Sequence, residues 1–239
     1  MSRIYPEITP GLNSVQAINA LGWEDSHRAL QFIDWLSSLV QRHGLLIDTV
    51  KSASADASFR RYFRIHSDSR SFILMDAPPD KEDCRPFVRI AGLLAEAGLH
   101  VPEVLAQDLA QGFLLLSDLG QRTYLQALRS EAPDPLYRDA IAALVRLQAA
   151  SRPDVLPPYD RALMLRELQL LPEWYLTQQL RVTLTEAQLQ PLQQVFDVLL
   201  DNCLQQPQVW VHRDYHSRNL MVLPARGPGI IDFQDALAG

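Results

Sequence analysis

Three polar residues in the C-terminal third of the sequence have the types and the spacing that suit phosphoryl transfer. Asp214 is followed by Asn219 five positions later, and Asp232 comes thirteen positions after that, directly behind the apolar pair Ile230-Ile231. A carboxylate such as Asp214 can accept the proton of an attacking hydroxyl. The amide oxygen of Asn219 and the carboxylate of Asp232 are hard ligands of the kind that Mg²⁺ binds. Because phosphoryl transfer depends mainly on positioning and charge neutralisation, these side chains predict a metal-assisted transfer site.

The residues around Asp214 form a pattern that is more specific than its parts. Isolated Asp and Asn residues in loops are usually turn formers, and a single His-Arg-Asp triplet is a weak signal. Here the sequence reads His-x-Asp-x-His-x-x-Asn, then a short apolar run, a turn and Ile-Ile-Asp-Phe. The joint pattern favours catalysis over a purely structural explanation. We expect His212, Arg213 and His216 to brace the loop and to orient Asp214.

The composition is that of an ordinary globular enzyme. The chain has 239 residues, 47% of them hydrophobic, and a formal net charge of −6. This acidic balance argues against nucleic-acid binding, because phosphate contacts need clustered positive charge. There is no apolar run long enough to span a bilayer and no N-terminal export signal, and Cys84 and Cys203 are too few for a disulfide framework. We therefore expect a cytoplasmic enzyme, most simply a monomer, with no membrane partner.

A strand-rich segment must supply the other side of such a site. Asp25-Ser26 and Gly44 predict the two ends of a helix whose apolar residues recur at helical spacing. A second helix is expected to stop at Gly98. The residues between and after these helices alternate in the manner of strands. The predicted strands are 45–51, 59–66, 71–77, 101–106 and 112–116, with a hairpin turn at 67–70.

Beyond residue 121 the apolar spacing becomes helical. Residues 162–181 predict one or two helices interrupted at Pro172. One predicted helix face consists of Ile141, Leu144, Val145 and Gln148. We expect an α+β protein in three regions: a lead-in and helix at 1–44, a sheet lobe at 45–120, and a helical lobe at 121–239 that carries the catalytic and metal-binding loops.

These motifs resemble those of the aminoglycoside phosphotransferase family, which is related to the protein kinases and choline kinases. Residues 212–221 and 231–239 are similar to its catalytic and metal-binding motifs, and the resemblance covers about residues 45–239. Within the family, residues 56–64 and 74–79 are most similar to the bacterial anomeric kinases of N-acetylmuramate and N-acetylglucosamine in cell-wall recycling. The resemblance implies a protein-kinase-like, two-lobed fold, in which an antiparallel N-lobe sheet with a helix covers ATP and the C-lobe is mostly helical.

The resemblance also implies roles, with ATP and Mg²⁺ as cofactors and a small amino sugar as substrate. Carried over by position, Asp214 is the catalytic base, and Asn219 and Asp232 are the magnesium ligands. The loop at 52–58, including Ser58, would cover the phosphates. It contains no glycine, so small residues and backbone N–H groups would have to cradle them. The adenine-binding linker is implied near 116–119, with Leu116 and Asp118 among the cofactor contacts.

The chain departs from the family at the cation that binds the phosphates. The third strand of the family's sheet usually ends in a lysine, and here that position falls at Met75 or a neighbour. Arginine suits phosphate recognition because its planar fork carries several donors. The candidate replacements are Arg60, Arg61 and Arg64, with Lys81 more distant. The glutamate that pairs with the family's lysine has two candidates, Glu82 and Glu96.

A second departure concerns the acceptor side. The chain stops eight residues after Ile231, whereas family members continue through helices that help to wall the acceptor site. We expect an apparently truncated helical lobe, with exposed apolar residues that such helices would cover. Two alternatives stay open: an aminoglycoside or other small-alcohol phosphotransferase, and a nucleotide-binding module without catalysis. An aminoglycoside would need an acidic pocket, whereas a lactyl-bearing sugar acid would favour an arginine such as Arg138, Arg166 or Arg181.

Overall fold

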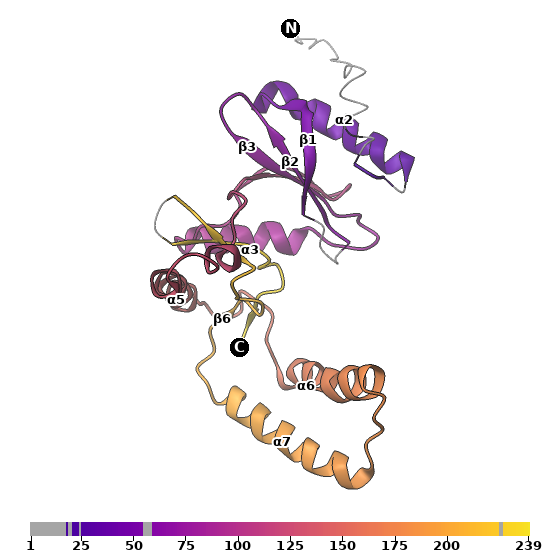
Figure 1. Cartoon of the computed structure of the whole chain (residues 1–239), viewed down its shortest axis with the longest axis vertical. Helices are drawn as coiled ribbons and strands as arrows, with labels where there is room; N and C mark the ends of the chain where they lie inside the picture. The colour runs from indigo at the N-terminus through magenta and orange to yellow at the C-terminus, as the bar shows by residue number, and fades with distance from the viewer. Residues whose placement is uncertain (1–17, 19–20, 24, 55–58, 225–226) are drawn as a thin grey trace.

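A sheet covered on both faces forms one end of the molecule. The computed structural model describes residues 18, 21–23, 25–54, 59–224 and 227–239. A five-stranded sheet carries helix α2 on one side and α3 on the other, and the remaining helices extend away from it (Figure 1). The site residues are therefore held between a sheet-based part and a mainly helical part.

Helix α2 (Ser26–His43) begins and ends where the sequence predicts. The side chain of Asp25 accepts a hydrogen bond from the His27 N–H, which satisfies one donor of the first turn. Gly44 takes the left-handed conformation, with φ 64°, that ends many helices and that glycine adopts without strain. The buried side chains of the helix share one face, and they are Ala29, Phe32, Ile33, Trp35, Leu36 and Leu39.

The predicted strands are confirmed, with ends that differ by a few residues. Neighbouring strands of the sheet are antiparallel throughout, in the order β1-β2-β3-β5-β4. The predicted hairpin turn is closed by the Ser67 N–H, which donates to the Arg70 carbonyl at 2.8 Å. The strands are β1 (Leu46–Ser54), β2 (Arg61–His66), β3 (Ser71–Asp76), β4 (Val104–Asp108) and β5 (Phe113–Ser117).

Alternate residues of the central strands enter two different cores, as the two-residue period of a strand requires. In β3, Phe72 and Leu74 pack with α2, together with Phe113 and Leu115 of β5. The residues between them point to the opposite face, where Met75 is fully buried. That face packs against helix α3 (Arg85–Glu96) through Phe87, Ile90, Ala91 and Leu94.

The second part of the chain is mainly helical. Its helices α6 and α7 pack against each other at the end of the molecule that lies farthest from the sheet (Figure 1). The predicted interruption at Pro172 is a change of helix type, because α6 is followed directly by the π-helix η1 with Pro172 in its first turn. The helices are α4 (Tyr124–Ala127), α5 (Pro133–Ala149), α6 (Arg161–Leu170), η1 (Leu171–Gln179) and α7 (Glu186–Leu204).

The buried face of α5 differs from the predicted one. Ile141 and Val145, which the apolar spacing placed on the packing face, are 59% and 56% exposed. The residues that α5 buries are Ala140, Ala143 and Leu147. Leu144 of the predicted face is partly buried against the same core, so the prediction holds for this residue. The two alanines add small side chains to the contact, and these allow the helix backbone to approach its neighbour closely. The prediction followed the spacing of the large apolar residues and therefore did not include the two alanines.

Two short ribbons complete the fold and carry the catalytic loop and the Ile-Asp-Phe segment. Strand β6 (Trp210–Val211) pairs with β9 (Leu237–Ala238), and β7 (Leu220–Val222) pairs with β8 (Pro228–Ile230). The Ile230 N–H donates to the carbonyl of His100 at 2.7 Å, which connects the second ribbon to the segment after α3. Among the described residues, no helix is long and apolar enough to cross a lipid bilayer.

Candidate active site

The pairing register of β7 and β8 brings Asn219 and Asp232 together. Leu220 pairs with Ile230, so Asn219 and Ile231 face each other just outside this pair. The Ile231 N–H donates to the Asn219 carbonyl at 3.1 Å. Asp232 follows directly, and its Oδ2 lies 3.3 Å from Asn219 Nδ2. The two predicted metal ligands are thus neighbours because a hairpin of fixed register connects them.

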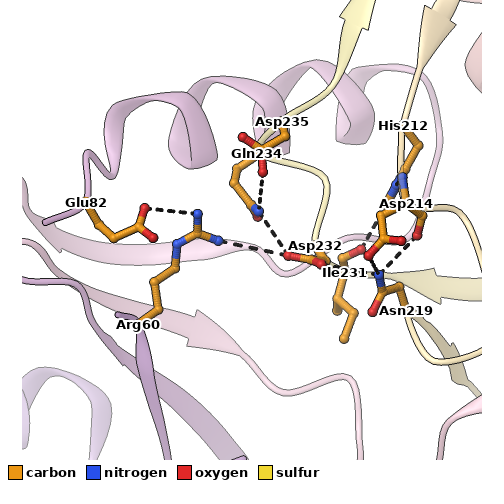
Figure 2. A network of polar contacts seen from close by, with 9 residues as sticks. All are labelled: Arg60, Glu82, His212, Asp214, Asn219, Ile231, Asp232, Gln234 and Asp235. Carbon is orange, nitrogen blue, oxygen red and sulfur yellow. Dashed lines mark hydrogen bonds and ion pairs between the residues drawn. The ribbon is translucent and has the colours of Figure 1, made fainter. Parts of the chain in front are cut away.

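Asp214 lies beside this pair (Figure 2). Asn219 Nδ2 donates to Asp214 Oδ2 at 2.7 Å and to the Asp214 carbonyl at 3.0 Å. His216 Nε2 lies 3.0 Å from Asp214 Oδ1. The side chain of Asp214 is 51% exposed, so its carboxylate is held in orientation and remains open to a substrate.

His212 connects the catalytic loop to the metal-binding segment from inside the fold. It is 2% exposed, and its Nε2 lies 3.1 Å from the carbonyl of Ile231. Its Nδ1 accepts a hydrogen bond from the Asp214 N–H at 3.3 Å. A ring that donates at Nε2 and accepts at Nδ1 is a neutral imidazole. Burial lowers the pKa of His212, which favours this neutral form.

Arg213 and Asp232 have unusual backbones at the two ends of this arrangement. Their φ angles are 70° and 62°, a left-handed conformation that non-glycine residues seldom adopt. The Arg213 guanidinium forms an ion pair with Glu167 of α6 and lies 3.4 Å from the carbonyl of Asp235. Strained backbone of this kind persists where the surroundings hold it, and it is common at functional sites.

Asn219 and Asp232 fit Mg²⁺ as a partial ligand set. Magnesium is usually held by one or two carboxylates, with water and substrate phosphates completing its octahedron. Rotation of the Asn219 amide exchanges Nδ2 for Oδ1, which turns a donor to carboxylates into a ligand for a cation. Within the described ranges there is no group of three or more His, Cys, Asp or Glu side chains that could hold a metal. Because two protein ligands leave most of the octahedron of Mg²⁺ to water and phosphate oxygens, Asn219 and Asp232 suit a cation that arrives with a phosphate ligand.

Gln234 is a member of the site that sequence reasoning missed. It is 9% exposed, and its Nε2 donates to Asp232 Oδ1 at 2.9 Å and to Asp235 Oδ2 at 3.2 Å (Figure 2). The amide thereby fixes the orientation of the Asp232 carboxylate. The one signal in the sequence is a polar residue two positions after a predicted metal ligand.

Among the described residues, only one of the candidate phosphate-binding cations lies near the metal-binding segment, on its sheet side. Arg60 Nη1 lies 4.0 Å from Asp232 Oδ1, and Arg60 Nη2 lies 3.1 Å from Glu82 Oε2 (Figure 2). Arg61 binds Asp76 instead, at 2.6 Å. The tertiary structure thus separates arginines that are adjacent in sequence.

The predicted linker contacts lie at the end of β5. Leu116 is buried in the sheet, and Asp118 Oδ2 and Oδ1 accept hydrogen bonds from Arg64 at 2.6 and 3.0 Å. Burial alone would raise the pKa of Asp118, but hydrogen bonds from Arg64, Ser71 and the Gly120 N–H keep it below its usual value. Arg64 therefore ties the linker to β2. Ser58 falls outside the described residues.

Comparisons of sequence give a family and several relatives. A sequence model described as "Phosphotransferase enzyme family" matches residues 49–239. A protein of Pseudomonas aeruginosa named N-acetylmuramate/N-acetylglucosamine kinase is 55% identical over 187 residues, which cover 78% of this chain and 55% of that protein. A protein of the same name from Pseudomonas putida is 51% identical over 191 residues, which cover 80% and 56%. The chain thus spans about half the length of these curated relatives.

Comparisons of structure show the fold. A crystal structure of aminoglycoside phosphotransferase APH(4)-Ia matches with a TM-score of 0.60 at 16% identity, covering 90% of this chain and 73% of that one. The streptomycin–ATP–APH(2″)-IIa ternary complex matches with a TM-score of 0.58 at 18% identity, covering 86% and 71%. These likenesses confirm the predicted α+β, kinase-like fold, with an antiparallel N-terminal sheet and a helical C-terminal part.

Proposed function

The chain belongs to the phosphotransferase enzyme family, as its motifs predicted, and from this premise we propose that it transfers a phosphoryl group from ATP to a hydroxyl of a small molecule. One observation carries the proposal. Asp214, Asn219 and Asp232 meet within hydrogen-bonding distance, because the β7–β8 hairpin returns the chain from Asn219 to Asp232. A carboxylate open to a substrate beside a carboxylate–amide pair is the arrangement that phosphoryl transfer needs.

Each side chain has a defined task in this proposal. Asp214 accepts the proton of the acceptor hydroxyl, and His216, whose Nε2 lies 3.0 Å from Asp214 Oδ1, holds its carboxylate in one orientation. Asp232 and Asn219 hold Mg²⁺, which neutralises charge on the phosphates when bound. Gln234 fixes the Asp232 carboxylate through the 2.9 Å hydrogen bond to Oδ1. The protein contributes position and charge, which is most of what this reaction requires.

We propose that the acceptor is the anomeric hydroxyl of N-acetylmuramate or N-acetylglucosamine, released during peptidoglycan recycling. Relatives carrying that name are 55% and 51% identical to this chain over most of its length. The residues of the site lie inside the matched family region, 49–239. Because the phosphate donor is ATP, we place the activity in the cytoplasm.

A panel of acceptors tests this function. ATP-dependent phosphate transfer is measured with the two amino sugars, a kanamycin-type aminoglycoside and choline. We expect the amino sugars to be phosphorylated and Asp214→Asn to lower the rate about 10²- to 10⁴-fold, because the proton acceptor is lost. Asp214→Asn should still bind Mg·ATP. Asp68→Asn, at an exposed hairpin position, is the matched control and should keep the wild-type rate.

The alternatives predict different results in the same experiment. A chain that binds Mg·ATP yet transfers phosphate to no member of the panel is a nucleotide-binding module, and the kinase proposal fails. If the aminoglycoside is a better acceptor than either amino sugar, the reaction class stands and the amino-sugar proposal fails. An unchanged rate in Asp214→Asn would remove this residue from the role of proton acceptor.

A further inference from the structure

The strand that carries the family's lysine offers no cation here. Met75, at the position where that lysine was expected, is fully buried and packs in the core that includes Phe87 and Ile90. The next residue, Asp76, is also fully buried and carries the opposite charge. Phosphates held by Mg²⁺ beside Asp232 still need a positive side chain. That side chain must come from another element.

Two of the arginines near β2 are already bound to buried carboxylates. Arg61 donates to Asp76 Oδ2 at 2.6 and 2.9 Å, and its guanidinium lies 3.8 Å from the ring centroid of Trp23. Arg64 donates to both oxygens of Asp118, which is buried at the linker. Releasing Arg61 would remove one of the two arginines that bind Asp76, and releasing Arg64 would leave Asp118 without its ion-pair partner. Both changes are unfavourable because the carboxylates are buried. Both arginines therefore hold the sheet together.

Arg60 is placed differently. Its side chain is 13% exposed and extends from the position just before β2 to the metal-binding segment, where Nη1 lies 4.0 Å from Asp232 Oδ1. Glu82, in the segment before α3, holds the other end of the guanidinium at 3.1 Å from Nη2. Figure 2 shows the guanidinium between these two carboxylates, on the opposite side of Asp232 from Asp214 and Asn219. A second basic residue of this region, Lys81, is 51% exposed and lies 3.7 Å from Asp80.

We propose that Arg60 is the phosphate-binding cation of this chain and that Glu82 is the residue that positions it. The inference rests on the proposed function and names a residue pair for it. A nucleotide whose phosphates share Mg²⁺ with Asp232 would meet Nη1, while Glu82 keeps the guanidinium plane in place through Nη2. Arginine suits this task because its donors form a rigid fork, so one edge can bind Glu82 while the other binds phosphate oxygens.

The choice of Glu82 over the other candidate glutamate follows from their contacts. Glu96, at the end of α3, lies 3.2 Å from Arg152, and both side chains are more than half exposed. Glu82 is 22% exposed and contacts Arg60. The pair would thus do the work of the family's lysine and glutamate from other positions: the cation comes from the residue before β2 and the glutamate from the loop before α3.

Equilibrium binding of adenosine, ADP and ATP in the presence of Mg²⁺ tests the proposal without requiring turnover. We expect Arg60→Met to weaken ATP binding about 10- to 100-fold, which is the usual range for a lost charge-assisted hydrogen bond to an anion. ADP should lose less, and adenosine should bind as it does to the wild type. Arg60→Lys should recover part of the phosphate-dependent affinity. Arg152→Met, at an exposed arginine that is likewise paired with a glutamate, is the matched control and should bind all three ligands normally.

The test of Glu82 must distinguish a residue that positions Arg60 from one that only stabilises the fold. Glu82→Gln should weaken ATP binding less than Arg60→Met does and should leave adenosine binding unchanged. In the Arg60→Met background, Glu82→Gln should have no further effect on ATP binding, because the residue that it positions is absent. An additive effect of the two substitutions would overturn the role given to Glu82.

The possible failures are distinguishable. If the wild type binds ATP and Arg60→Met binds it equally well, the assignment of Arg60 is wrong and the proposed function stands. If Arg60→Met loses adenosine and ATP affinity to the same extent, Arg60 supports the fold and does not bind phosphate. If the folded wild type binds no nucleotide, both the proposed function and this assignment fail.

Discussion

His212 shows how one buried side chain can position two others. Its ring connects the backbone N–H of Asp214 to the carbonyl that precedes Asp232, so both carboxylates depend on the same neutral imidazole. Protonation of Nδ1 would place a hydrogen where the Asp214 N–H now donates. The low exposure of the ring, 2%, also disfavours the charged form.

The lowered pKa of His212 predicts a dependence of stability on pH. In the unfolded chain the group titrates near 6.5, and burial lowers its pKa in the folded protein. Between these two pKa values the unfolded state binds more protons, so the free energy of unfolding should fall as the pH decreases below about 6.5. Denaturant unfolding at pH 7.5 and pH 5.5 measures this, and the decrease should be smaller in His212→Gln. At pH 7.5 the variant should be less stable by about 1–3 kcal/mol, because a buried hydrogen bond is lost.

His43 supplies the control for that experiment. Burial and two nearby arginines, Arg42 and Arg70, lower the pKa of His43. His43 should therefore also make the free energy of unfolding fall as the pH decreases. It lies on α2, away from the catalytic loop, and His43→Gln should reduce the pH dependence without changing nucleotide binding. If the pH dependence is the same in the wild type and in His212→Gln, His212 is not the group that titrates.

At the scale of elements, one carboxylate joins α2 to the sheet. Asp76 ends β3 and is fully buried, with Arg28 of α2 at 2.6 Å from Oδ1 and Arg61 of β2 at 2.6 Å from Oδ2. The guanidinium of Arg28 also lies 4.0 Å from the ring centroid of Phe113. A helix and two strands thus share one buried charge, and Arg61, the residue that follows Arg60, is held in this way.

Removal of this carboxylate should be strongly destabilising. Asp76→Ala leaves two partly buried guanidinium groups without their acceptor, and we expect the free energy of unfolding to fall by about 3–5 kcal/mol. Chemical denaturation with α-helical circular dichroism as the signal measures the change. Asp80→Ala, at a position 72% exposed in the side chain, should change stability by less than about 0.5 kcal/mol. A loss in Asp76→Ala as small as that of the control would show that α2 does not depend on this cluster.

At the scale of the whole molecule, the helical part farthest from the sheet has many exposed apolar side chains. We call this set the distal apolar surface. Its members on η1 include Trp174 and Tyr175, which are 65% and 53% exposed. On α7, Val198 is 69% exposed. Exposed apolar side chains that lie together can mark a surface that binds another apolar molecule.

The distal apolar surface should bind a hydrophobic dye. A dye whose fluorescence rises in apolar surroundings should respond to the folded wild type, and the response should be lower in the double variant Trp174→Ser, Tyr175→Ser. Because both side chains are exposed, stability should change by less than about 0.5 kcal/mol for each substitution. Leu74→Ala, in the fully buried core beneath α2, is the contrasting variant and should lose about 2–5 kcal/mol. Equal dye binding by the wild type and the double variant would mean that these two residues do not form the binding surface.

The sequence predicted the structural features that depend on residues close together in the chain. The ends of α2 follow from Asp25 and Gly44, the strands from two-residue alternation, and the family from the motif around Asp214 and Asp232. These features are local because caps, pleats and hairpins are made by residues close together in the chain. The domain boundary near residue 120 and the roles of individual site residues stay predictions.

Tertiary structure alone decided which side chains meet across the molecule. Three arginines within five positions contact different carboxylates: Glu82 and Asp232 for Arg60, Asp76 for Arg61, and Asp118 for Arg64. The buried face of α5 likewise depended on how closely a neighbour could approach its alanines. Local patterns carry no information on such pairs, because each partner is selected by the packing of elements that are distant in the sequence and by the burial of the charge it must satisfy.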